Sequence, residues 1–229
     1  KITNERIDHF AGKWVLQHNS GNCAAIVNGP VDEWLKSSLY EAINFPLGCT
    51  ATKSIFWLQA PEDLLLDLQS FLAGLKAGDP LDPQMQIGYV NPRNLDYLQA
   101  TLQRNHLRLQ SFGGERLSPI QARPLLVASQ EELPDFLADE IPAYVLAVQS
   151  CGDSRQAIER INHYTTREPR LAVSLYRLSE PERIAAMQEL RAHTVLVDLP
   201  TNRVMPAFHE GNDYALSLST AKLIAGQSL

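Results

Sequence analysis

Short apolar runs alternate with amphipathic segments along most of this chain, and this alternation constrains its fold more than any other feature. Residues 23–27 form a continuous apolar run, which is typical of a buried parallel strand. Residues 31–44 carry large apolar side chains at helical spacing: Trp34, Leu35, Leu39 and Ile43. Strands that alternate with helices of this length predict an α/β domain with an open, mainly parallel sheet flanked by helices.

The same pattern continues toward the C-terminus. Further strands are expected at 52–58, 107–109, 124–129, 144–149, 171–176 and 194–199, and further helices at 61–75, from 91 onward, and at 154–164, 181–191 and 219–224. The turn-forming residues at 77–83 are the best candidate linker, but this run is too short to separate two domains. We therefore expect a single domain over residues 1–229.

Composition and charge exclude several classes of function. The net charge is -6, and Lys and Arg are scattered without a basic patch, so we expect no nucleic-acid partner. No apolar run approaches the roughly 18 residues that a membrane span needs, and the N-terminus does not resemble a signal peptide. The three cysteines lack metal-binding spacing, as do His163, His193 and His209, so we expect no metal and a cytoplasmic, reducing location.

Cys49 is the most informative single residue. It lies in the segment Phe45-Pro46-Leu47-Gly48-Cys49-Thr50-Ala51, between an expected helix and an expected strand. A thiol in such a loop can act as a nucleophile, or it can pack as a small apolar side chain. For Cys23 and Cys151 a packed, structural role is expected.

The Cys49 segment resembles the cysteine loop of the aldehyde dehydrogenase superfamily. Further segments resemble the catalytic domain of that family in the same order: 78–88, 113–116, 140–148, 159–162 with 171–176, and 191–197. The match covers roughly residues 10 to 225 and implies the fold of the catalytic half without the dinucleotide-binding half. Short stand-alone insect proteins with the same partial resemblance, of unassigned function, are the nearest comparison.

The resemblance also implies roles for individual residues. Cys49 takes the place of the catalytic thiol. The general base of the family is a Glu, whose position falls on Gln17 or His18 depending on the direction of alignment, and His18 is the candidate base because imidazole titrates near neutral pH. Glu140 takes the place of a Glu that contacts the nicotinamide ribose, and is a candidate cofactor-binding residue.

Neither Gln17 nor His18 is a carboxylate, so the resemblance implies that the catalytic site is damaged. The sequence has no Gly-rich phosphate loop of the G-x-G-x-x-G type, so we expect no cofactor, and NAD or NADP only if the missing half is supplied. The preferred hypothesis is a degenerate, non-catalytic domain that acts through protein contacts, as a homodimer or with a protein partner, because an uncovered catalytic half would expose apolar surface. The alternatives are a fragment of an NAD(P)-dependent aldehyde dehydrogenase, and thiol-based acyl transfer or ester hydrolysis at Cys49.

Overall fold

A seven-stranded sheet forms the centre of the molecule. The structure is a computed structural model that describes residues 21–43, 49–59, 64–79, 81–105, 110–129, 133–137, 141, 143–165 and 169–203. The strand order is β3-β6-β7-β2-β1-β8-β9, and every neighbouring pair is parallel except β3 with β6. The strands are β1 Cys23–Asn28, β2 Thr52–Leu58, β3 Gln110–Gly113, β6 Leu125–Ser129, β7 Val145–Cys151, β8 Arg170–Tyr176 and β9 Ala192–Val197. The predicted open, mainly parallel sheet is confirmed.

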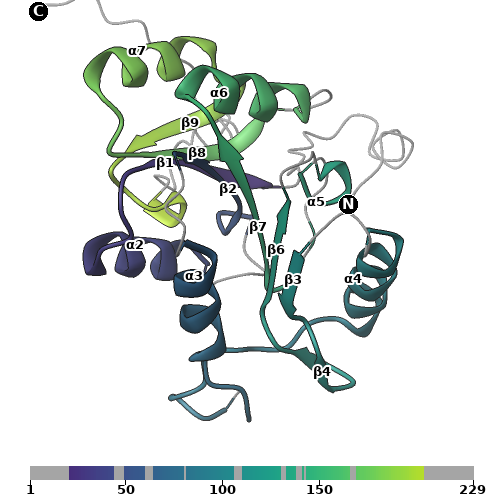
Figure 1. Cartoon of the computed structure of the whole chain (residues 1–229). Helices are drawn as coiled ribbons and strands as arrows, with labels where there is room; N and C mark the ends of the chain where they lie inside the picture. Colours follow the sequence, from purple (N-terminus) through teal and green to yellow (C-terminus); the bar gives the residue numbers. More distant parts are fainter. Residues whose placement is uncertain are drawn as a thin grey trace, which may run out of the picture.

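Helices cover both faces of the sheet. They are α2 Glu33–Ile43, α3 Leu64–Ala73, α4 Pro92–Asn105, α5 Pro134–Leu137, α6 Ser154–His163 and α7 Glu180–Glu189, followed by the 3-10 helix η2 Thr201–Arg203. Figure 1 shows α6 and α7 on one face and α2 and α3 on the opposite face. A small hairpin of β4 Arg116–Ser118 and β5 Gln121–Ala122 extends beyond β3. No helix in the described ranges is long and apolar enough to cross a membrane.

The core lies around the central strands. All seven residues of β2 are buried, and Phe56 and Trp57 are among the largest fully buried side chains. The Trp57 indole still satisfies its polar atom, because Nε1 donates to the carbonyl of Gly29 at 3.2 Å. Complete burial of side chains of this size contributes about 1.5–3 kcal/mol each. The sheet is therefore a rigid platform for the loops at its ends.

Most of the expected elements are present, and the differences have physical reasons. Trp34 was one of the apolar residues at helical spacing in 31–44, but its side chain is 46% exposed, in a T-shaped contact with Tyr176 and with the Arg177 guanidinium over its ring. The cation–π contact and the aromatic contact hold the ring at the surface. Residues 107–109 and 219–224 lie outside the described residues, and the observed edge strand begins at Gln110.

Candidate functional site

Cys49 lies in a tight turn immediately before β2, as the sequence predicted for a loop between a helix and a strand. Its side chain is half-buried. The turn is at the amino end of the parallel strands, whereas ligands of open α/β sheets usually bind at the carboxyl ends. The thiol therefore does not occupy the common ligand crevice of an open sheet, and any chemistry there depends on contacts specific to this edge.

The start of β1 holds the Cys49 turn from one side. The Cys23 thiol donates a hydrogen bond to the carbonyl of Cys49, with 3.2 Å between Sγ and O. Gly21 lies so close that a Cβ atom built on it would be 1.5 Å from the same carbonyl oxygen and 2.7 Å from the Cα atom of Cys49. Only glycine fits between these two backbones, so Gly21 is what allows the Cys49 turn to pack against the start of β1.

The 3-10 helix after β9 holds the turn from the other side. The fully buried Thr201 donates through Oγ1 to the carbonyl of Thr50 and lies 2.9 Å from Oγ1 of Thr52. This helix is in turn tied to α2, because Arg203 forms an ion pair with Glu41 at 2.6 Å. Contacts from two distant parts of the chain thus fix the backbone on which the Cys49 thiol is mounted, which is the kind of support that a reactive group requires.

Arg170, the first residue of β8, is a buried cation at the same edge. Its side chain is 2% exposed, and its guanidinium donates to the carbonyls of Asn22 at 2.6 Å and Leu137 at 2.9 Å. Burial lowers the pKa of Arg170 to about 10, while the nearby Cys23 acts in the opposite direction. The guanidinium is thus fixed beside Asn22, the residue that precedes Cys23.

Lys53 in β2 is a second buried cation near the turn. Its side chain is 3% exposed, and Nζ donates to the carbonyl of Ala143 at 2.9 Å. Arg170 and Lys53 thus bind the chain at Leu137 and at Ala143, on either side of residue 140. Sequence analysis missed both residues. For Lys53 the available signal was a lysine inside a run that otherwise favours a buried strand.

Several predicted site residues lie outside the described residues: Gln17, His18 and Glu140. Two residues that are near them in the sequence lie at the same edge of the sheet as Cys49. Gly21, which follows His18 closely in the sequence, contacts the Cys49 backbone, and Leu137, which precedes Glu140, accepts from Arg170. The proposed roles of His18 and Glu140 remain predictions.

Cys151 lies apart from this edge. It is buried at the carboxyl end of β7, and its Sγ is 3.6 Å from a guanidinium nitrogen of Arg160. Burial raises the pKa of the Cys151 thiol more than the nearby Arg160 lowers it. This thiol fits the expected structural role. Among the residues that the structure describes, no cluster of three or more His, Cys, Asp and Glu side chains could hold a metal ion.

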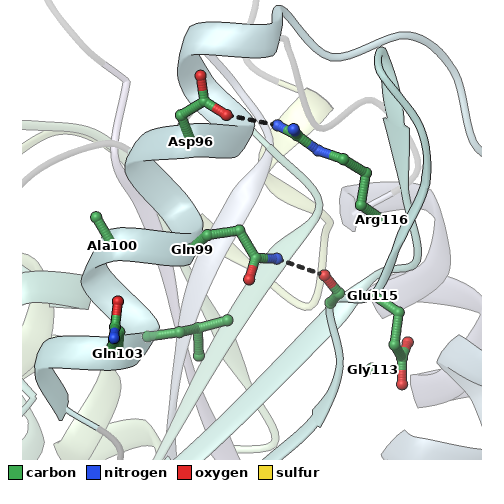
Figure 2. A pocket seen from close by; sticks show the side chains of 9 residues that line it. Asp96, Gln99, Ala100, Gln103, Gly113, Glu115 and Arg116 are labelled. Carbon is green, nitrogen blue, oxygen red and sulfur yellow. Dashed lines mark hydrogen bonds and ion pairs between the residues drawn. The ribbon is translucent and has the colours of Figure 1, made fainter.

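A cavity of about 650 Å³ lies between α4 and the Gly113-Gly114-Glu115-Arg116 segment. Asp96 and Arg116 form an ion pair at 2.7 Å, and the Gln99 amide donates to the carbonyl of Gly114 at 2.8 Å. Figure 2 shows Asp96 and Gln99 on α4 reaching toward the segment that carries Arg116. This cavity lies beside β3, whereas Cys49 precedes β2. Strands β6 and β7 separate β3 from β2, so these two strands are roughly 14 Å apart across the sheet. Asp96 and Arg116 pair with each other, and Glu115 is the remaining charged residue of a lining that contains no cysteine or histidine, so this cavity offers no evident reactive centre.

Comparison with known proteins agrees with this architecture. No family model and no curated protein sequence matches the chain. Solved structures of aldehyde dehydrogenases do match. Lactaldehyde dehydrogenase from Escherichia coli aligns with a TM-score of 0.70 and 17% identity, over 83% of this chain and 41% of that chain. NADP-dependent glyceraldehyde-3-phosphate dehydrogenase from Bacillus halodurans aligns with a TM-score of 0.72 and 19% identity, over 87% of this chain and 44% of that chain. The chain therefore spans less than half the length of either enzyme.

Proposed function

We propose that this chain, which has the fold of the aldehyde dehydrogenase catalytic domain, acts through protein contacts as a homodimer and does not itself oxidise aldehydes with NAD or NADP. The observation that carries the proposal is the outer strand β9. None of its six residues is buried, whereas all seven residues of the neighbouring β8 are buried. The helix that leads into β9 also exposes about half of Ile184 and Met187. Apolar surface of this kind favours association.

A second copy of the chain is the partner that β9 fits best. In the described part of the chain, β9 pairs only with β8, so no described strand occupies its other backbone edge, along which a strand of a second copy could pair. Two copies related by a two-fold axis would pair their β9 strands antiparallel. The two-fold axis is perpendicular to the sheet and keeps each residue on its own face, so the register must be centred on a residue. A register centred on Thr194, which is not buried, places the Thr194 side chains of the two copies opposite each other.

Like charges placed opposite each other at Thr194 test the homodimer. We expect wild type to sediment as a dimer at tens of micromolar, and Thr194→Lys to weaken dimerisation by about tenfold or more, because two lysines would then face each other across the axis. Ser70→Lys on the exposed side of α3 adds the same charge away from β9 and should leave the dimerisation constant unchanged. A wild-type protein that stays monomeric at these concentrations would exclude the proposal.

Thiol chemistry at Cys49 is the second candidate, and the fold is also compatible with a piece of an NAD(P)-dependent aldehyde dehydrogenase. The specific observation in favour of thiol chemistry is that Cys49 is half-buried on a turn whose backbone is fixed from both sides. If the thiol transfers acyl groups, Cys49→Ala will abolish hydrolysis of p-nitrophenyl acetate, while Cys151→Ala will retain the wild-type rate. Equal rates for wild type and Cys49→Ala would rule out this activity.

A further inference from the structure

Two cysteines that are distant in the sequence lie together at the amino end of the sheet. Cys23 Sγ is 3.2 Å from the carbonyl oxygen of Cys49, and the two residues are separated by 26 positions in the chain. Both belong to one small apolar cluster, in which Cys49 and Leu196 pack against the buried Cys23, Leu171 and Ala172. The close approach of Gly21 to the Cys49 backbone brings the two chain segments into direct contact.

The spacing of these segments suits a disulfide. Cys23 is paired with Thr52 across the β1–β2 ladder, and Cys49 lies in the turn that enters β2 at Thr52. Neighbouring strands lie about 4.8 Å apart, and a disulfide joins residues whose Cα atoms are about 4.4–6.8 Å apart. All three cysteines of the chain are thiols in the structure, so a Cys23–Cys49 bond would be a modification of the state described here.

The surroundings of the two sulfurs differ in a way that assigns them different roles. Cys49 is half-buried and can be reached by a small oxidant, whereas Cys23 is 0% exposed. The guanidinium of Arg170 is also buried here, where it donates to the carbonyl of Asn22, the residue before Cys23. We infer that Cys49 and Cys23 are a peroxide-responsive thiol pair, in which a hydroperoxide oxidises Cys49 and Cys23 then closes a reversible disulfide.

The chemistry needs only the two thiols and the hydroperoxide. The Cys49 thiolate attacks one peroxide oxygen, so an S–O bond forms as the O–O bond breaks, and the departing oxygen takes up a proton and leaves as water. Sulfur is oxidised to the sulfenic acid and the peroxide is reduced. The Cys23 sulfur then attacks the Cys49 sulfur, an S–S bond replaces the S–O bond, and the hydroxyl leaves as a second water with the Cys23 proton. Hydrogen peroxide and two thiols become one disulfide and two waters.

This inference is independent of the proposed dimer and of any activity toward esters. Oxidation would remove the Cys49 nucleophile and join β1 covalently to the turn that Thr201 already holds. A thiol reductant would restore both cysteines, because the bond is a disulfide and not a higher oxide. The site is therefore a place for reversible modification of this chain.

Peroxide treatment followed by mass spectrometry tests the pair. The intact chain is treated with hydrogen peroxide, alkylated and digested without reduction. We expect a cross-linked peptide that contains Cys23 and Cys49 and has lost two hydrogens, both in wild type and in Cys151→Ser. In Cys23→Ser, which keeps the hydrogen bond to the Cys49 carbonyl, Cys49 should be trapped by dimedone and should reach the sulfinic acid about tenfold faster than in wild type.

Two outcomes would overturn the inference. One is formation of sulfinic acid at Cys49 at the same rate in wild type and in Cys23→Ser, without a cross-linked peptide. The other is a disulfide that contains Cys151. If Cys23→Ser folds poorly by circular dichroism, the wild-type measurement still decides, because the cross-linked peptide and its loss on reduction are observed without any substitution.

Discussion

Replacement of Gly21 with alanine will lower the free energy of unfolding by about 3 kcal/mol or more, which corresponds to a fall in melting temperature of roughly 6–12 °C for a chain of this size. The added methyl group would lie 1.5 Å from the carbonyl oxygen and 2.3 Å from the carbonyl carbon of Cys49. Both are backbone atoms that cannot rotate away, so the turn or the start of β1 must move. Thermal and urea unfolding monitored by circular dichroism measure this loss.

Gly152→Ala is the matched control for Gly21→Ala. A Cβ atom at Gly152 would meet only the end of the Gln156 side chain, at 3.9 Å. We expect this variant to unfold within about 0.5 kcal/mol of wild type. The Gly21 variant should also show a changed rate of Cys49 alkylation, since the same clash displaces the thiol turn. A Gly21→Ala protein as stable as Gly152→Ala would contradict the described packing of β1 against Cys49.

Gly113→Ala will cost about 3 kcal/mol, because two effects add at this position. The backbone of Gly113 has φ +76°, a conformation that costs other residues about 1–2 kcal/mol. A Cβ atom there would also lie 2.1 Å from the carbonyl oxygen of Pro124. Gly113 pairs with Leu125 in the β3–β6 ladder, so the strain acts on the edge strand. Unfolding in urea measures the total, and hydrogen exchange should show the loss of protection concentrated in β3.

Gly74→Ala serves as the control for the edge-strand variant. Its added methyl group would be at least 3.4 Å from its neighbours, an ordinary contact, at the end of α3. If Gly113→Ala matches this control in stability and in hydrogen exchange, the described pairing of β3 with β6 is wrong. A uniform loss of protection across all strands would instead mean that β3 unfolds together with the whole sheet.

The central strands could be predicted from the sequence because their signal is local. The runs that became β1, β7 and β8 are mostly apolar because both faces of these strands are largely buried, and β2 contains the apolar segment Ile55-Phe56-Trp57-Leu58. Helical spacing identified α2, α4 and α6. The hairpin of β4 and β5 was missed, since strands of three and two residues are too short to show a period. The same limit applies to η2, although its Thr201 is central to the thiol turn.

The candidate site could be predicted only in part. Cys49 was identified because its neighbours in the sequence place it in a loop before a strand. Gly21, Cys23, Thr201 and Arg170 were not linked to it, since nothing in their local sequence refers to residue 49. Gly21 and Cys23 meet Cys49, and Arg170 lies nearby, because parallel strands bring their amino ends to one edge of the sheet, whatever their separation along the chain. Thr201 reaches the same turn from the 3-10 helix that follows β9.

The sequence by itself determined the class of fold, the order of the main elements and the position of one thiol at the entry to a strand. The physical reason is that burial imposes a period of two or 3.6 residues that a single segment carries. The tertiary structure alone decided which residues surround that thiol, that a second thiol lies beside it, and that β9 remains at the edge of the sheet. Those properties depend on strand order and register, which arise from the packing of the whole chain and not from any one segment.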